Sequence, residues 1–247
     1  MFKKKLKRDH YFYKIYFYYF LFFHHKCLFK KKTYSQSGED FYINSYFKNK
    51  NDGFYVDIGC FHPIMHSNTA KLYNRGWNGV NIDINQTSID LFNIARKRDK
   101  NFCVAISNET KKVTSYTDNN FSSINSINKK FFEFALNKYS DGKFTQNQIE
   151  SYKFIDFLKK FNLEIRKIDF LNIDAESHDY EVLQGIDFNK VDIKFICVEM
   201  FDENSRIYKN KFINFLNSFN YEYLKSIGAN GFFQKKQKSL FTSLLCK

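Results

Sequence analysis

Short apolar runs alternate with amphipathic stretches from residue 33 onward. Five runs have the length and apolar content of buried strands, and they cover residues 53–58, 79–84, 102–106, 168–173 and 193–199. Apolar residues at helical spacing predict helices over residues 37–47, 68–75, 88–98, 149–161, 180–184 and 207–219. Strands that alternate with helices in this way predict a doubly wound parallel sheet of the α/β class.

Two further parts of the chain follow other patterns. Residues 117–147 are rich in Asn, Ser and Lys and predict an irregular insert with one helix over residues 130–137, next to a short candidate strand at 113–116. Residues 221–227 and 231–234 are separated by a glycine-containing turn. They predict an antiparallel pair that closes the sheet.

Charge divides the chain of 247 residues into three parts. The net charge of +13 suggests a nucleic-acid partner, but residues 1–32 hold ten basic residues and one acidic residue, and residues 235–247 hold four basic residues and no acidic one. The body between them, residues 33–234, has equal numbers of basic and acidic residues. We therefore predict one neutral domain at 33–234 between two basic ends, and no nucleic-acid partner.

The N-terminal part contains an almost wholly aromatic run from Tyr11 to Phe23, with lysines on both sides. As a helix, this run would span about 20 Å, which is short of the ~30 Å hydrocarbon core of a bilayer. Tyrosine favours the headgroup level, and lysine is attracted to anionic lipids. The favoured interpretation of residues 1–32 is an anchor at an anionic membrane surface. A floppy or locally packed extension and a short signal-anchor are the alternatives.

The five cysteines indicate a reducing compartment. Their number is odd and none lies within a few residues of another, so the sequence contains neither a CxxC motif nor a secreted disulfide framework. Together with the basic aromatic end, this predicts a cytoplasmic protein that lies peripherally at the inner face of the membrane.

Carboxylates end four of the five predicted strands, where open α/β sheets bind their ligands. They are Asp57, Asp83, Asp174 with Glu176, and Glu199, whereas Ser107 ends the third strand. Gly59 lets the backbone approach a ligand closely, and Asp83 ends the next strand, where an acid accepts hydrogen bonds from ribose hydroxyls.

The glycine turn DIGCFHP has one glycine, so it does not match the dinucleotide fingerprint, which has three. An acid beside this turn instead suits S-adenosylmethionine, which has an ammonium, a sulfonium and a ribose. Asn68 and Ser107 are further candidates for cofactor binding, with Asn68 at a helix N-terminus that could hold the cofactor's carboxylate. The alternative is an ordinary turn with a solvated aspartate.

Candidate catalytic residues follow the fourth predicted strand. His178 is the first choice for a catalytic base because it titrates near neutral pH beside carboxylates. Asp174 is the alternative base, with Glu176 in the same turn. Asp174 and Glu176 could also hold a divalent cation through their oxygens, an alternative that we do not favour.

Four segments give the chain a family resemblance. Residues 34–40 (YSQSGED), 53–63 (GFYVDIGCFHP), 67–83 (SNTAKLYNRGWNGVNID) and 168–188 (IDFLNIDAESHDYEVLQGIDF) together resemble the FkbM family of S-adenosylmethionine-dependent methyltransferases. The resemblance implies a class I methyltransferase fold, which is Rossmann-like and has a mostly parallel seven-stranded sheet with an antiparallel last strand. It also implies that Gln36 and Glu39 close over the cofactor, and that the substrate is a hydroxyl of a sugar or glycoconjugate.

The chain departs from the family pattern at two places. Asp83-Ile84 stands where the family often has Glu-Pro, and a shorter acid can still reach a ribose. Ser177 stands where the family usually has the glycine of D-x-E-G. If that position needs a positive φ, serine is strained there. The alternative function is therefore a membrane-tethered binding protein that keeps the fold with little or no turnover.

Overall fold

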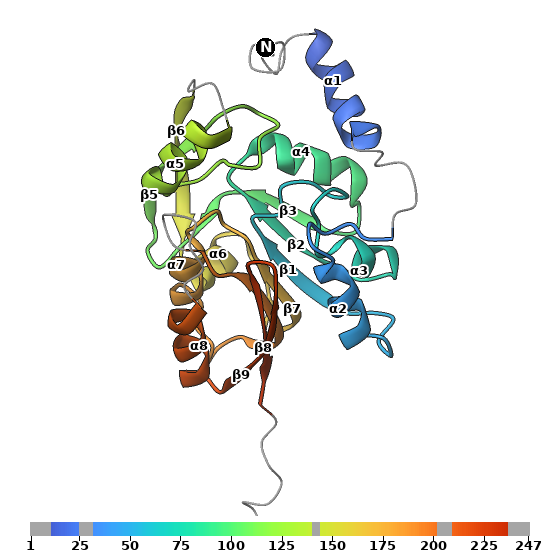
Figure 1. The fold of residues 1–247 in the computed structure, drawn as a ribbon, viewed down its shortest axis with the longest axis vertical. Helices are drawn as coiled ribbons and strands as arrows, with labels where there is room; N and C mark the ends of the chain where they lie inside the picture. Colours follow the sequence, from blue (N-terminus) through green and yellow to red (C-terminus); the bar gives the residue numbers. More distant parts are fainter. Residues whose placement is uncertain (1–10, 25–31, 140–143, 202–208, 237–247) are drawn as a thin grey trace, which may run out of the picture.

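The computed structural model describes residues 11–24, 32–139, 144–201 and 209–236, and contains one large sheet (Figure 1). The sheet has seven strands in the order β3-β2-β1-β7-β8-β10-β9, and only β10 runs against the others. The strands are β1 (Phe54–Ile58), β2 (Asn78–Asp83), β3 (Lys100–Cys103), β7 (Lys167–Ile173), β8 (Asp192–Glu199), β9 (Tyr221–Ile227) and β10 (Asn230–Lys235). The predicted α/β class and the mostly parallel seven-stranded sheet with its antiparallel last strand are confirmed.

Helices cover both faces of this sheet (Figure 1). On one face, Val56 and Ile58 of β1 pack with apolar residues of α6, α7 and α8, and on the other Tyr55 packs with Trp77 and residues of α2 and α3. The helices are α1 (Tyr11–Phe22), α2 (Glu39–Tyr46), α3 (Ala70–Asn74), α4 (Gln86–Ala95), α5 (Lys129–Tyr139), α6 (Phe154–Lys160), α7 (Asp179–Gln184) and α8 (Lys209–Ser218). Burial on both faces explains why the strands read as continuous apolar runs.

The strand order reverses between β1 and β7. β1 lies between β2 and β7 and is parallel to both. The loops that leave β1, β2 and β7 therefore emerge together at one edge of the sheet, which is where ligands bind in folds of this kind. The backbone stays paired there, because the amide of Gly59 donates to the Ile82 carbonyl and the amide of Asp174 donates to the Ile58 carbonyl.

A second, smaller sheet corrects two predictions. Its strands are β4 (Ala105–Ile106), β5 (Lys111–Thr117) and β6 (Thr145–Tyr152), in the order β4-β6-β5. The predicted strand 102–106 is thus divided between the two sheets. The predicted helix 149–161 is wrong over its first residues, since Ile149 and Tyr152 have helical spacing to Ile155 but the backbone here pairs with β5, and helix α6 begins only at Phe154.

Helix α1 packs against the domain. Its residues Tyr13, Phe17, Phe20 and Leu21 are buried in a cluster with Met65, Leu91 and Phe121. Among the interpretations of the N-terminal part, the described residues thus show local packing, and none of their helices is long and apolar enough to cross a membrane. The rest of the basic N-terminal part, the start of the helix predicted at 207 and the tail from 237 lie outside the described residues.

Candidate functional site

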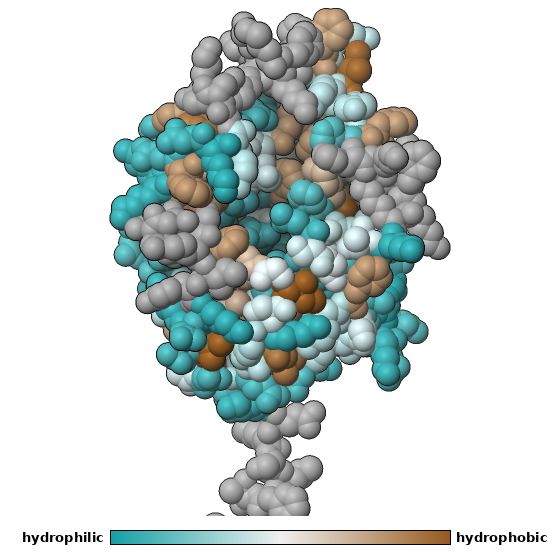
Figure 2. All heavy atoms as spheres, in the orientation of Figure 1, coloured by the Kyte–Doolittle hydropathy of each residue, from teal (hydrophilic) through white to brown (hydrophobic). Residues whose placement is uncertain are grey.

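A cavity of about 760 Å³ opens at the carboxyl ends of the strands. Its floor is formed by Gly59, Asp83, Asp174 and Glu199, from the ends of β1, β2, β7 and β8. Residues of the segment 118–139 line a second side, and Phe20 and His24, from the end of α1 and just beyond it, also line the cavity. Figure 2 shows the hollow in the middle of the face in view. The position matches the one expected from the strand order.

Gly59 allows the turns after β1 and β7 to meet. It has a φ of 79°, and a Cβ added there would overlap the carbonyl group of Asp174. Any other residue would push the two turns apart and add strain at a positive φ. The glycine predicted from the sequence is therefore a requirement of the floor itself.

Asp83 lines the cavity and is held in place by backbone amides. One carboxylate oxygen accepts from the Phe61 amide at 2.8 Å and the other from the Asn85 amide at 2.7 Å. Burial raises the pKa of Asp83 to about 6, against these two hydrogen bonds, which lower it. Each oxygen keeps a further lone pair, so the side chain is positioned to accept hydrogen bonds from a ligand.

Asp57 and Asn68 lie below the floor and do not line the cavity. One oxygen of Asp57 accepts from the Thr69 hydroxyl at 2.7 Å and the other from the Asn172 amide at 2.9 Å. Asn68 donates to the Asn172 carbonyl oxygen at 2.9 Å. The structure thus brings Asp57 and Asn68 together in one buried network and separates both from Asp83.

The cation of this network is Arg96, which was not among the residues predicted from the sequence. Arg96 at the end of α4 is 2% exposed and donates to the Thr69 hydroxyl at 2.8 Å and to the Ser67 hydroxyl at 2.9 Å. A buried arginine with several acceptors stabilises the loop between β1 and α3. Its sequence signal was weak, because Arg96 stands in a stretch with two other basic residues, Lys97 and Arg98, that could equally be a solvated helix end.

The two residues that the resemblance placed over the cofactor are in different surroundings. Gln36 is exposed and lines the cavity. Glu39 is buried, and its oxygens accept from the Ser37 amide at 2.8 Å and the Asn230 side chain at 3.1 Å. Glu39 thus ties the start of α2 to β10, while Gln36 remains available to a ligand.

His178 lines the cavity at the start of α7, and Ser107 lies behind it. The Nε2 atom of His178 is 2.9 Å from the Ser107 hydroxyl, and Nδ1 is 3.8 Å from the Glu181 carboxylate. Burial lowers the pKa of His178 below its ordinary value of 6.5. The imidazole is therefore neutral at pH 7 and can accept a proton, whereas Ser107 contacts the histidine and does not line the cavity.

Four carboxylates crowd the ends of β7 and β8. Burial, followed by repulsion from neighbouring carboxylates, raises the pKa of Asp174 to about 7 and that of Asp179 to about 8, and it raises the pKa values of Glu176 and Glu199 well above the ordinary range. Asp174, Glu176 and Glu199 line the cavity, and none of the three forms a side-chain hydrogen bond or ion pair with a described residue. This side of the cavity therefore favours a cationic ligand.

The turn after β7 has an unusual backbone. Glu176 and Ser177 have φ values of 53° and 64°, so both are left-handed. The Ser126 hydroxyl donates to the Glu176 carbonyl and the Asn128 side chain donates to the Ser177 carbonyl, each at 2.9 Å. The position of Ser177 does require the positive φ that a glycine would adopt freely, and residues of the insert hold the strained turn in place.

The described residues include no group of three His, Cys, Asp or Glu side chains arranged to hold a metal ion. Asp174 and Glu176 are the two residues considered for a divalent cation. Glu199 lines the same cavity, but the three side chains do not form such a group.

Comparison with known protein families gives one match. A family model described as the methyltransferase FkbM domain matches residues 50–223, which is more than half of the chain. No curated protein matches the chain. The matched segment includes all five parallel strands whose ends form the cavity or flank it, and it begins after the first motif of the resemblance, residues 34–40.

Proposed function

Because the chain belongs to the FkbM family of methyltransferases, we propose that it transfers a methyl group from S-adenosylmethionine to a hydroxyl of a sugar or glycoconjugate. The observation that carries the proposal is the cavity at the strand ends. It combines a ribose-type acid, Asp83, with unpaired carboxylates and a neutral histidine, His178. Its volume of about 760 Å³ is that of a small-molecule site.

The residues of the cavity fit S-adenosylmethionine. Asp83 would accept hydrogen bonds from the ribose hydroxyls, because its carboxylate faces the cavity and is fixed by two amides. Asp174 and Glu176 pair with no described residue, and a bound ammonium or sulfonium would lower their raised pKa values and so favour the charged carboxylates that complement it. When bound, S-adenosylmethionine supplies a methyl carbon on a cationic sulfur.

His178 would take the proton of the acceptor hydroxyl. Its lowered pKa keeps it neutral at pH 7, and Ser107 fixes the ring through Nε2. Asp174, with a pKa of about 7, is the second candidate for this step, and both residues line the cavity.

The wall formed by the insert supports a sugar as the acceptor. Its lining includes the aromatic residues Phe121 and Phe131 and the polar residues Asn119, Ser122 and Asn125. Aromatic faces pack on the apolar side of a sugar ring, and amides and hydroxyls pair with its hydroxyls.

Calorimetric titration with S-adenosylmethionine tests cofactor binding. We expect the intact chain to bind, and Asp83→Asn to bind at least about tenfold more weakly, because it loses a charged acceptor for the ribose. Asp52→Asn is the matched control, since Asp52 is exposed and lies away from the cavity. Equal affinities of the wild type and Asp83→Asn would contradict the ribose assignment.

Turnover is tested separately, by transfer of a labelled methyl group to a panel of free and conjugated sugars. Transfer that needs a free hydroxyl supports the proposed reaction. Cofactor binding without transfer to any sugar would favour the alternative, a membrane-tethered binding protein, for which the strained Ser177 in the site is the motivating observation.

A further inference from the structure

Helix α1 has two apolar faces. The inner face is buried against the domain through Tyr13, Phe17, Phe20 and Leu21. The outer face, continued by Phe23 just after the helix, carries six large apolar side chains that are between 47% and 74% exposed: Tyr11, Phe12, Ile15, Tyr18, Tyr19 and Phe23. Figure 2 shows apolar atoms exposed at the top right, where Figure 1 places α1. A soluble surface helix normally presents polar residues on its outer side, and an exposed apolar patch of this kind marks an interaction surface.

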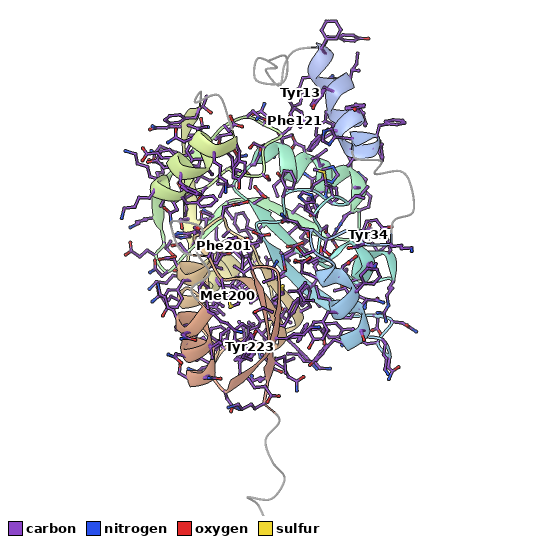
Figure 3. The ribbon with its side chains drawn as sticks, in the orientation of Figure 1. Tyr13, Tyr34, Phe121, Met200, Phe201 and Tyr223 are labelled. Atoms are coloured by element: carbon purple, nitrogen blue, oxygen red, sulfur yellow. The ribbon has the colours of Figure 1, made fainter. Side chains whose placement is uncertain are left out.

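The inner face fixes α1 to the cavity. The Tyr13 hydroxyl lies 2.8 Å from the Thr87 hydroxyl, and the Phe20 carbonyl lies 3.2 Å from Nε2 of His62. The Phe20 ring also packs on Phe121, with centroids 4.9 Å apart, and Figure 3 shows Tyr13 beside Phe121. Because Phe20 lines the cavity, whatever binds the outer face is held close to the site.

The charge around α1 selects the partner. Residues 1–32 hold ten basic residues against one acidic residue, and Lys14 lies exposed on the helix itself. An anionic lipid surface attracts each such cation by about 1 kcal/mol, and tyrosine and phenylalanine settle at the headgroup level. A helix of 12 residues is about 18 Å long, so it would lie in the plane of the interface.

We propose that the outer face of α1 is a docking surface for an anionic lipid bilayer. Docking holds the cavity beside the membrane, because the inner face of the same helix forms part of the cavity wall. A second step rests on the proposed function. The acceptor is then a sugar carried on a lipid, which the bilayer presents to the site.

Vesicle flotation of the full chain tests the docking surface. We expect flotation with vesicles of equal parts phosphatidylcholine and phosphatidylglycerol, little flotation with phosphatidylcholine alone, and a decrease with added salt. The double variant Ile15→Gln/Tyr18→Gln removes two exposed apolar side chains and should lose about tenfold or more in partitioning.

The matched control is Phe41→Gln/Phe134→Gln, which removes two aromatic side chains, 51% and 39% exposed, from α2 and α5. It should float like the wild type, and thermal melts should show both double variants folded. Equal flotation of the two double variants, or no flotation of the wild type, overturns the proposal. Self-association that is lost in Ile15→Gln/Tyr18→Gln, without flotation, would assign the face to a second copy and also overturns it.

The acceptor is tested on the same proteins with one sugar, free or attached to a lipid chain in vesicles. The wild type should methylate the lipid-linked form faster, and Ile15→Gln/Tyr18→Gln should lose that preference while binding S-adenosylmethionine normally. An unchanged preference in the variant overturns the link between docking and acceptor. Failure of S-adenosylmethionine to bind any of the proteins would instead contradict the proposed function and leave the flotation result standing.

Discussion

Two groups of carboxylates lie at the same edge of the sheet in opposite states. Asp57 and Glu39 are buried, and both oxygens of each accept hydrogen bonds from protein groups. Asp174, Glu176 and Glu199 line the cavity and pair with no described residue. The first group stabilises the architecture, and the second leaves its carboxyl oxygens available to a ligand. Asp57 and Asp174 both stand at the end of a parallel strand, so their hydrogen-bond partners, not their positions, distinguish a structural acid from a binding acid.

Turnover should separate the groups most strongly. We expect His178→Gln to lower turnover by about 10²–10⁴-fold, because it removes the group that takes the hydroxyl proton, while S-adenosylmethionine still binds. The wild-type rate should fall with acidification only below the ordinary histidine value of 6.5, since burial lowers the pKa of His178.

A rate that falls already near pH 7 would instead make Asp174 the base, as its raised pKa of about 7 requires. Asp174→Asn distinguishes the two cases. If Asp174 is the base, the fall in rate near pH 7 should be absent in the variant. If His178 is the base, the dependence of the rate on pH should keep its shape. Full turnover of His178→Gln would exclude the histidine.

Two alanine variants, one from each group of carboxylates, compare the contributions of the groups to the stability of the fold. Asp57→Ala leaves the Thr69 hydroxyl and the Asn172 amide without their acceptor, and should lower the free energy of unfolding by about 3 kcal/mol. In a domain of this size, that corresponds to a fall in Tm of about 6–12 °C. Asp174→Ala removes a buried carboxyl group that pairs with no described residue, and it should leave Tm unchanged or raise it. Thermal melts that show equal losses would contradict the division into two groups.

The sequence predicts those parts of the site that depend on neighbouring residues, and not those that depend on residues far apart in the chain. The strand ends and Gly59 were predicted because they depend on local pattern: an apolar run, then a polar residue, then a turn. The separation of Asp57 from Asp83 was not, because it depends on Asn172, a residue 115 positions away that supplies the partner. The contact of His178 with Ser107 likewise joins residues 71 positions apart.

The errors in the predicted fold also arise where a distant partner decides the local conformation. Residues Ile149 and Tyr152 have helical spacing, but the partner strand β5 lies more than 30 positions upstream and its ladder decides the conformation. For the aromatic N-terminal run, composition predicts apolar contact without saying with what. Only the packing on Met65 and Phe121 shows that one face belongs to the domain.

Stability against pH gives a smaller effect that tests the crowded carboxylates at the ends of β7 and β8. The raised pKa values of Asp174, about 7, and Asp179, about 8, mean that the folded state binds protons more tightly than the unfolded chain, whose aspartates titrate near 3.8. The contribution of these groups to stability is therefore full below pH 3.8 and is lost as pH rises toward 8.

In melts without cofactor, this contribution should make the fall in Tm between pH 6 and pH 8 smaller in Asp179→Asn than in the wild type, with Asp52→Asn as the control. Added S-adenosylmethionine should raise Tm more at pH 8 than at pH 6, because the carboxylates are charged at pH 8. An identical pH dependence in Asp179→Asn and the wild type would show that burial does not strain this group.

The smallest effect concerns the backbone of the turn that carries the unpaired acids. Ser177 has a φ of 64°, which costs a non-glycine residue about 1 kcal/mol. Ser177→Gly and Ser177→Ala both remove the hydroxyl, so the difference between their free energies of unfolding reports the backbone alone. We expect the glycine variant to be more stable than the alanine variant by about 1 kcal/mol, less the entropy that glycine loses on folding. Equal stabilities in urea unfolding would mean that Ser126 and Asn128 hold a turn that is not strained.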